Sequence, residues 1–148
     1  MLLRSTLRCL DRLTARLGLS VERAPHLVFG SRGEDEAYFY LRTLGFTVVA
    51  RDYRSPRRRG DIDLIAWEKD TLCFVEVKTR SRRNFMAAEA AVDDEKRTIL
   101  SALGREYLRQ CAHAPAKAPR FRFDVMSVYL ENNAPVEITL FREAFRMS

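Results

Sequence analysis

GDIDLIAWEKDTLCFVEVKTR, residues 60–80, consists of two apolar runs on either side of a short polar connection. The runs 61–67 and 72–78 are strand candidates because they are rich in β-branched and aromatic residues. The polar residues 68–71 form a connection of the kind that joins two antiparallel strands. The stretch therefore predicts a β-hairpin, and the apolar residues on both of its faces predict a sheet that is covered on both sides.

The length of the connection decides which residues face one another across this hairpin. With two or four residues in the connection, Asp63 lies opposite Glu76 and Asp61 lies opposite Lys78. An odd number would move every side chain of one strand to the other face. With the even number, one face carries three carboxylates and one ammonium group at its open end. Near the turn the same face is apolar and consists of Ile65, Trp67, Leu72 and Phe74.

Asp63 and Glu76 repel each other in this register, because directly opposed Cβ atoms lie roughly 4.5 to 5.5 Å apart. A divalent cation between them converts the repulsion into coordination. Oxygen ligands without a nearby His or Cys favour Mg²⁺ or Mn²⁺ over zinc. Lys78 projects from the same face, where it can orient or deprotonate a water, or stabilise charge on phosphorus. The alternative is a salt-bridge cluster that neutralises itself, which is costly in a sheet covered on both faces.

The first core helix is predicted at residues 33–44, which repeat apolar residues at helical spacing. Glu34 belongs to the inward stripe of this helix. A carboxylate that faces the core needs a partner such as a cation or a metal-bound water, unless it is there for the helix dipole. Further strand candidates are residues 46–52, 121–130 and 136–141.

A second helix follows the hairpin, capped by Asp93 or Asp94 and ending near Ala112. Lys96 begins on its inward side, where it points at a phosphate near the hairpin or extends along the helix surface. In the strand candidate that comes next, Asp124 is expected to pair with an arginine rather than to act in chemistry.

The composition is ordinary for one globular domain: 148 residues, 47% hydrophobic and 31% charged, with no apolar run long enough to cross a bilayer. Cys9, Cys73 and Cys111 are far apart and set among apolar neighbours, so we expect reduced core thiols and a cytoplasmic protein. The net charge of +6 favours a polyanionic partner.

Residues 1–24 form a distinct N-terminal segment in which leucines at helical spacing run beside arginines. This pattern predicts a basic amphipathic helix that Gly18 and Pro25 end. Such a helix can dock on the domain, lie along nucleic acid or a membrane surface, or serve as a transit peptide. The expected organisation is an extension at 1–24 and one domain at 25–148.

A basic loop, SPRRRG at residues 55–60, comes directly before the hairpin. Arg57, Arg58 and Arg59 in this loop are placed to bind phosphates, although a plain solvated turn has the same composition. The hairpin itself, with GDIDLI at 60–65 and FVEVKTR at 74–80, resembles the PD-(D/E)xK nuclease motif. More closely, it resembles the YraN family of bacterial endonuclease-like proteins. The same likeness includes GSRGE at 30–34, Ala37, GF at 45–46, AV at 91–92, Lys96 and RFDV at 122–125.

The resemblance implies an α/β fold with a restriction-endonuclease-like core, in which a mixed sheet is flanked by helices and the hairpin lies at its centre. By position, Asp63 and Glu76 would bind Mg²⁺ or Mn²⁺, with the Val77 carbonyl completing the shell. Lys78 would serve the water, and Glu34 would support the site from the first helix. Nucleic acid would be contacted by Arg57, Arg58, Arg59, Arg80 and Lys96.

Two positions depart from the pattern of the motif. Ile62 stands where the superfamily often has Pro, which is harmless in a strand. Asp61 stands where the family usually has Glu, so a direct role of Asp61 at the metal is not implied.

These features favour a metal-dependent endonuclease that acts on DNA, in repair or recombination, with branched or single-stranded DNA among the candidate substrates. A homodimer is expected if it resolves junctions, and a repair or recombination protein is an expected partner. The alternative is a catalytically weak nucleic-acid-binding or adaptor protein with a nuclease-like fold. A phosphatase acting on small esters is a remote third hypothesis.

Overall fold

The computed structural model describes residues 25–81, 92–111 and 119–148. The expected extension 1–24 lies outside these residues. The elements are α2 (Pro25–Thr43), β1 (Thr47–Tyr53), β2 (Ile62–Glu68), β3 (Thr71–Arg80), α3 (Asp94–Cys111), β4 (Arg120–Tyr129) and β5 (Glu137–Phe145). The strands form one sheet in the order β1-β2-β3-β4-β5, in which β3 and β4 are parallel and the other neighbours antiparallel.

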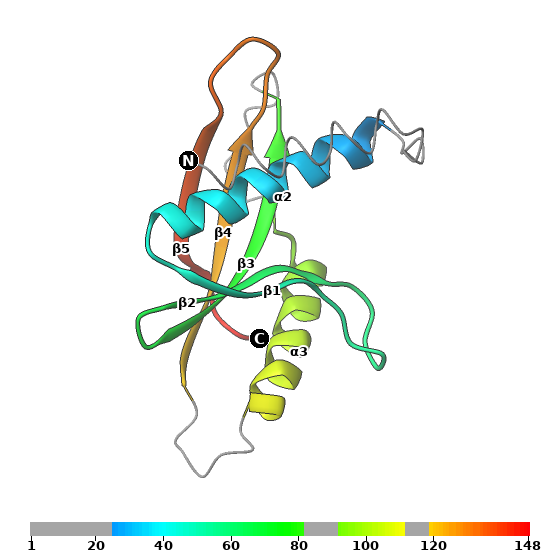
Figure 1. The fold of residues 1–148 in the computed structure, drawn as a ribbon. Coiled ribbons are helices and arrows are strands. Elements are labelled where there is room, and N and C mark those ends of the chain that lie inside the picture. Colours follow the sequence, from blue (N-terminus) through cyan, green and yellow to red (C-terminus); the bar gives the residue numbers. More distant parts are fainter. Residues whose placement is uncertain (1–24, 82–91, 112–118) are drawn as a thin grey trace, which may run out of the picture.

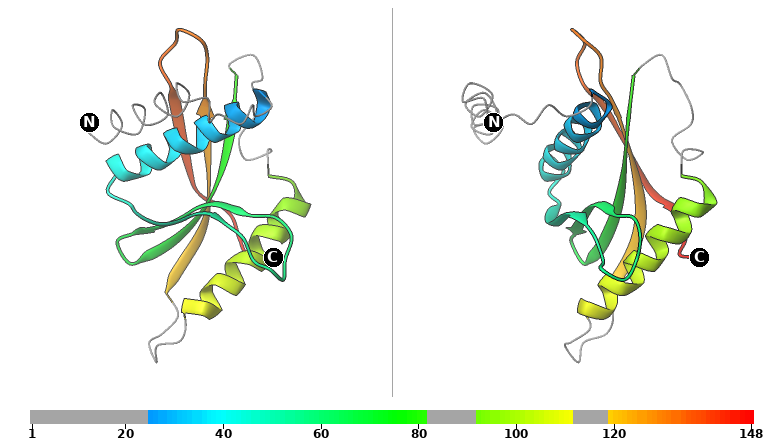
Figure 2. Two further views of the ribbon diagram at one scale, coloured as in Figure 1. Left: turned by 45° about the vertical axis from the view of Figure 1, so that its right-hand side comes forward. Right: turned by 90° about the vertical axis from the view of Figure 1, so that its right-hand side faces the viewer.

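A helix covers each face of this sheet (Figure 1, Figure 2). Ala37 and Leu41 of α2 pack into the buried cluster on one face, and Leu100 and Leu103 of α3 pack into the cluster on the other. The predicted mixed sheet flanked by helices, with the hairpin at its centre, is therefore confirmed. In the described part of the chain, no helix has the length and apolar character needed to span a membrane.

The β2–β3 hairpin has the predicted even register near its turn. Its ladder begins at Glu68↔Thr71 and continues to Leu64↔Val75, so two residues connect the strands. Phe74 consequently lies in the cluster on the α3 face, as the alternation of side chains predicts.

Helix α2 begins at Pro25, well before the predicted start at Gly33. Proline suits the first turn of a helix, where a backbone N–H has no partner within the helix. Gly33 lies inside the helix instead, at its contact with β3. A Cβ atom on Gly33 would lie 1.8 Å from Thr79 Oγ1. The glycine therefore marks a close approach of helix and strand, not a helix boundary.

Gly33→Ala is expected to destabilise the fold by about 1 to 3 kcal/mol, because its methyl group forces α2 away from β3. Gly30 on the same helix is the matched control, since a Cβ there would meet nothing within 4 Å. Gly30→Ala is expected to stabilise the helix by roughly 0.5 to 1 kcal/mol. Urea unfolding measures both variants, and equal stability of the two would contradict the close approach.

Other predicted elements differ from the structure at their ends. Strand β5 continues to Phe145, beyond the predicted end at residue 141, because its pairing with β4 resumes after a bulge. Helix α3 ends at Cys111 and is capped by Asp93, whose Oδ1 accepts a hydrogen bond from Lys96 N at 2.8 Å. Of the cysteines expected in the core, Cys73 is buried and Cys111 is exposed at the end of α3. Cys9 lies outside the described residues.

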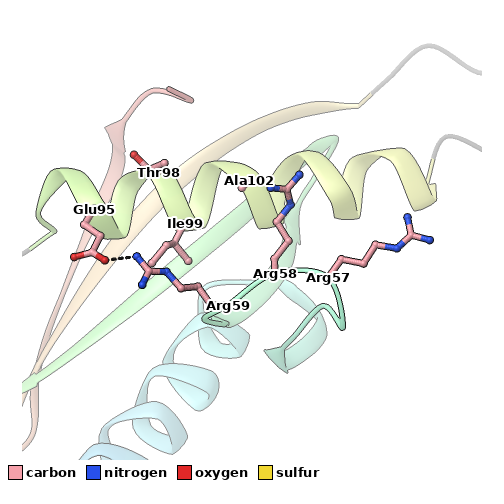
Figure 3. Close-up of a pocket in the computed structure, with 7 residues that line it drawn as sticks. All are labelled: Arg57, Arg58, Arg59, Glu95, Thr98, Ile99 and Ala102. Atoms are coloured by element: carbon pink, nitrogen blue, oxygen red, sulfur yellow. Dashed lines mark hydrogen bonds and ion pairs between the residues drawn. The ribbon is translucent and has the colours of Figure 1, made fainter.

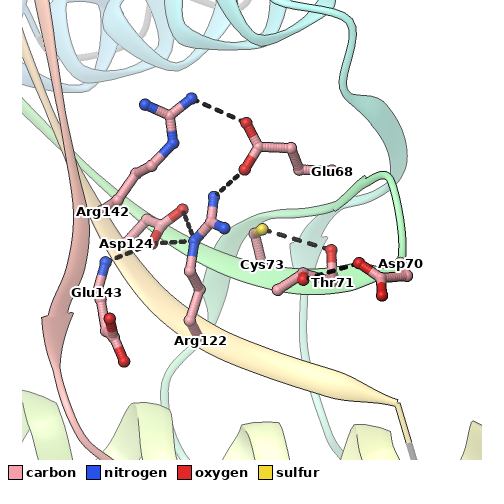
Figure 4. Close-up of polar contacts among 8 residues, drawn as sticks. All are labelled: Glu68, Asp70, Thr71, Cys73, Arg122, Asp124, Arg142 and Glu143. Carbon is pink, nitrogen blue, oxygen red and sulfur yellow. Dashed lines mark hydrogen bonds and ion pairs between the residues drawn. The ribbon is translucent and has the colours of Figure 1, made fainter.

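A network of charged groups joins β2, β4 and β5 (Figure 4). Arg122 Nε donates to both carboxylate oxygens of Asp124, at 2.9 and 3.0 Å, and Asp124 is fully buried. Arg122 Nη2 and Arg142 Nη2 bind the two oxygens of Glu68, at 2.7 and 2.8 Å. The main-chain N–H of Glu143 also donates to Asp124, at 2.8 Å. The predicted pairing of Asp124 with an arginine is confirmed.

Candidate active site

Asp63 lies at the point where β2 and β3 cease to pair. Its Oδ2 accepts a 2.6 Å hydrogen bond from the main-chain N–H of Val77. The ladder between the strands ends at Leu64↔Val75, so the prediction that Asp63 directly opposes Glu76 in the ladder is wrong. The carboxylate of Asp63 thus accepts a main-chain hydrogen bond from β3, and the nearby negative charge of Glu76 contributes to its raised pKa.

The side-chain alternation of β2 changes at the same place. Ile62, predicted to share a face with Leu64, packs instead with Ile65 in the cluster on the α3 face. Two residues three positions apart do not share a face in a regular strand, so the alternation of side chains is not maintained between Ile62 and Ile65.

Glu76 is held between two ammonium groups. Its side chain is 4% exposed, and its Oε1 lies 2.7 Å from Lys78 Nζ, which donates a hydrogen bond to it. Its Oε2 lies 3.1 Å from Lys96 Nζ. The geometry of this second contact is not that of a hydrogen bond, and Oε2 is a buried oxygen without a hydrogen-bond partner among the described residues. Helix α3 thus supplies a cation that contacts the hairpin motif directly.

Asp61 and Lys78 do not form the predicted pair across the hairpin. Strand pairing stops before it reaches Asp61, which precedes the first residue of β2. Asp61 Oδ2 lies 3.1 Å from Arg54 Nη2, and Asp61 Oδ1 lies 3.7 Å from Lys96 Nζ. Lys78 pairs with Glu76 on its own strand instead. Sequence reasoning did not single out Arg54, because no pattern marks it.

Burial and repulsion between carboxylates shift their acidity. Burial, followed by the negative charge of Glu76, raises the pKa of Asp63, while the hydrogen bond from Val77 and the charge of Lys96 oppose the shift. Burial also raises the pKa of Glu34, and the charge of Glu34 adds to the shift of Asp63. Helix α2 therefore contributes a carboxylate whose charge acts on Asp63.

Nearby acidic residues favour the charged form of Lys96. Burial by itself would lower the pKa of Lys96, but Glu76, Asp63 and Asp61 together raise it. The ammonium form of Lys96 is therefore stabilised by three acidic residues.

The donor atoms fit a hard cation held by two carboxylates. Among the described residues, no three His, Cys, Asp or Glu side chains are grouped closely enough to hold a metal ion by themselves. Asp63 and Glu76 supply two carboxylates, and the buried Oε2 of Glu76 lacks a hydrogen bond. Oxygen donors of this kind suit Mg²⁺ or Mn²⁺, and Mg²⁺ commonly keeps several waters beside one or two carboxylates.

The predicted basic loop lies against α3, and together they line an open pocket of about 430 Å³ (Figure 3). Arg59 forms an ion pair with Glu95, and Arg58 Nε lies 3.7 Å from Glu106 Oε2. The guanidinium of Arg57 has no ion pair within the described residues. The pocket is lined by Arg57, Arg58, Arg59, Glu95, Thr98, Ile99 and Ala102.

The predicted nucleic-acid contacts therefore occupy different places. The three loop arginines line the pocket, and Lys96 follows Glu95 on α3 and reaches Glu76. Arg80 is half-buried at the last position of β3, where its carbonyl accepts a hydrogen bond from Leu130 N at 2.9 Å. Arg80 is not among the residues that line the pocket.

Known relatives share most of this chain. A family model described as "Uncharacterised protein family UPF0102" matches residues 33–128, which include the hairpin and α3. A UPF0102 protein of Koribacter versatilis is 50% identical over 123 residues, or 83% of this chain and 82% of the relative. One of Solibacter usitatus is 48% identical over 108 residues, or 73% and 80%. One of Rhodococcus opacus is 37% identical over 122 residues, or 82% and 99%. The chain therefore belongs to the UPF0102 family, the YraN family that its hairpin motif resembles.

Proposed function

We propose that this protein is a metal-dependent endonuclease that hydrolyses phosphodiester bonds in DNA. The observation that supports this function is the gathering of Asp63, Glu76 and Lys78 at the open end of one hairpin, with Glu76 buried. A bound Mg²⁺ or Mn²⁺ supplies a water of lowered pKa and neutralises charge on the scissile phosphate. In this proposal Asp63 and Glu76 hold the cation, with the Val77 carbonyl as a third donor.

The other residues bind and orient the reactants. Lys78 is 28% exposed, so its ammonium group can donate to the attacking water or to the phosphate. Glu34 adds negative charge from α2. The loop arginines bind phosphates on either side of the scissile bond. DNA repair or recombination is the proposed setting, with a repair or recombination protein as the proposed partner.

The experiment that tests this function is cleavage of end-labelled single-stranded, duplex, flap and four-way-junction DNA in Mg²⁺, Mn²⁺ or EDTA. Cutting in the presence of either metal, and none in EDTA, is expected. If the four-way junction is the preferred substrate, sedimentation should show a homodimer, because two strands must be cut. Absence of cutting with every substrate and metal would refute the proposal.

A second function is supported by the two ion pairs that Glu76 forms. Both of its oxygens lie against ammonium groups, so its charge is already compensated by the chain itself. A nucleic-acid-binding or adaptor protein with weak catalysis would have this property. It would bind DNA in a salt-sensitive manner without divalent metal, and Glu76→Ala would leave that binding intact.

Arg57→Gln is expected to weaken DNA binding about equally for all sequences and to lower the salt dependence of binding by about one phosphate contact. The reason is that Arg57, unlike Arg58 and Arg59, has no acidic partner within the described residues. Arg109→Gln removes the same charge from the exposed last turn of α3 and is the matched control. Fluorescence anisotropy over a range of salt concentrations measures both. An equal effect of the two variants would show that the loop has no special role.

A further inference from the structure

The ammonium group of Lys96 lies among acidic groups in the manner of a bound cation. Its Nζ lies 3.1 Å from Glu76 Oε2, 3.7 Å from Asp61 Oδ1 and 3.5 Å from the main-chain oxygen of Asp61. The Lys96 side chain is 25% exposed and that of Glu76 is 4% exposed, so this contact is shielded from water, unlike a surface ion pair. The three oxygens come from two separate positions of the chain, as ligands of a metal ion do.

Asp63 reaches the same part of β3, because its Oδ2 accepts a 2.6 Å hydrogen bond from the N–H of Val77, the residue after Glu76. The charge of Lys96 acts on the acidity of Asp63, and the charge of Asp63 acts on Lys96. Lys78 contacts the other oxygen of Glu76, Oε1. Lys96 therefore contacts two acidic residues, Glu76 and Asp61, whereas the ion pair of Lys78 within the described residues is with Glu76.

We propose that Lys96 is a resident counter-cation, which occupies the divalent-metal position of the metal-free protein and competes with the metal for Glu76 Oε2. This inference rests on the proposed metal-dependent function. Two cations at one buried oxygen repel each other strongly, so metal binding requires the ammonium group to leave. Helix α3 does not need to move for this, because the flexible side chain of Lys96 can change its conformation. The backbone N–H of Lys96 can meanwhile keep its 2.8 Å hydrogen bond to Asp93 Oδ1.

The Lys96 side chain is 25% exposed, so a phosphate of bound DNA can offer the released ammonium group a new partner. Metal and DNA consequently strengthen each other's binding, because each stabilises the displaced position of Lys96. The free protein is expected to bind divalent metal weakly until DNA is present.

The test compares Mn²⁺ binding by the wild-type protein and Lys96→Met without DNA, with free Mn²⁺ measured by electron paramagnetic resonance. Methionine keeps an unbranched side chain but removes the charge. We expect Lys96→Met to bind Mn²⁺ at least about tenfold more tightly, because the competitor is gone. Lys69→Met removes the same charge from the exposed hairpin turn and is the matched control, with an affinity within about twofold of wild type.

Each outcome decides the inference. Unchanged Mn²⁺ affinity of a folded Lys96→Met protein would overturn it, and the cleavage assay of the wild-type protein would still decide the proposed function separately. If Lys96→Met is unfolded without metal and folds when Mn²⁺ is added, as circular dichroism would show, the inference is supported because the metal replaces the missing cation. If the variant stays unfolded even with Mn²⁺, Lys96→Gln takes its place in the titration, since its amide can still donate to Oε2. Wild-type affinity of Lys96→Gln would overturn the inference.

Discussion

Glu76→Gln is expected to lower the rate of DNA cleavage at least about 10³-fold, equivalent to about 4 kcal/mol of transition-state stabilisation. Glutamine keeps the shape of the side chain but removes the charge that Lys78 and Lys96 both contact, at 2.7 and 3.1 Å. Without that charge the site loses one of the two carboxylates that we propose bind the metal, and the group that contacts Lys78. DNA binding is expected to persist, because the substitution removes a negative charge and leaves the proposed phosphate-binding residues in place.

Asp70→Asn is the matched control for Glu76→Gln. Asp70 is exposed in the turn of the same hairpin, so the substitution changes the net charge equally but lies at the far end from the site. Single-turnover cleavage and anisotropy on the preferred substrate measure chemistry and binding separately. Wild-type cleavage by a folded Glu76→Gln protein would refute the nuclease assignment of this site. If the wild-type protein binds DNA but does not cut it, the adaptor function is the better description.

Arg122→Met is expected to lower the free energy of unfolding by about 3 to 5 kcal/mol at neutral pH. Arg122 makes both side-chain hydrogen bonds to the carboxylate of Asp124, which is fully buried (Figure 4). Loss of the guanidinium leaves a buried negative charge whose remaining donor within the described residues is the backbone N–H of Glu143, at 2.8 Å. Urea unfolding monitored by fluorescence measures the change. Arg120→Met, an exposed arginine on the same strand, is the control and is expected to change stability by less than about 0.5 kcal/mol.

The pH dependence of this variant follows from the acidity of Asp124. Burial already raises the pKa of Asp124 despite the hydrogen bonds from Arg122, and removal of Arg122 raises it further. A carboxyl group with a raised pKa in the folded state costs stability when it is ionised, and this cost disappears below its unfolded pKa. The deficit of Arg122→Met should therefore be largest above the folded pKa of Asp124 and shrink as the pH falls. Arg122→Met/Asp124→Leu should recover most of the loss at neutral pH, because neither charge remains buried. A deficit independent of pH, with no recovery in the double variant, would contradict this account.

The hairpin shows how far local pattern predicts structure. Its register near the turn follows from the two-residue connection and from apolar alternation, both of which are local properties. The same reasoning fails at Asp63, where it assumes that the strands stay paired to their ends. Beyond the end of the ladder, the main-chain N–H of Val77 donates a hydrogen bond to the Asp63 carboxylate. The spacing of apolar residues cannot predict a side chain that accepts a hydrogen bond from the backbone of a neighbouring strand.

The start of α2 was missed for a related reason. In a sequence, glycine at the edge of an apolar repeat resembles a helix boundary, because glycine is a poor helix former. The structure uses Gly33 for a contact with Thr79 of β3, which is distant in sequence. Only the packing of helix against strand separates these two uses of glycine.

By itself, the sequence determined that the protein has an α/β core with a central hairpin, and that acidic residues and Lys78 gather at the open end of that hairpin. Residue types and period-two spacing carry this information locally. Only the tertiary structure decided that Lys96, rather than Lys78, approaches Asp61. The position of α3 on the sheet depends on close packing, since a Cβ on Gly104 would lie 3.0 Å from the Phe123 ring and 3.3 Å from that of Phe74. The partner of each charge in this site is therefore set by contacts between elements that no single segment encodes.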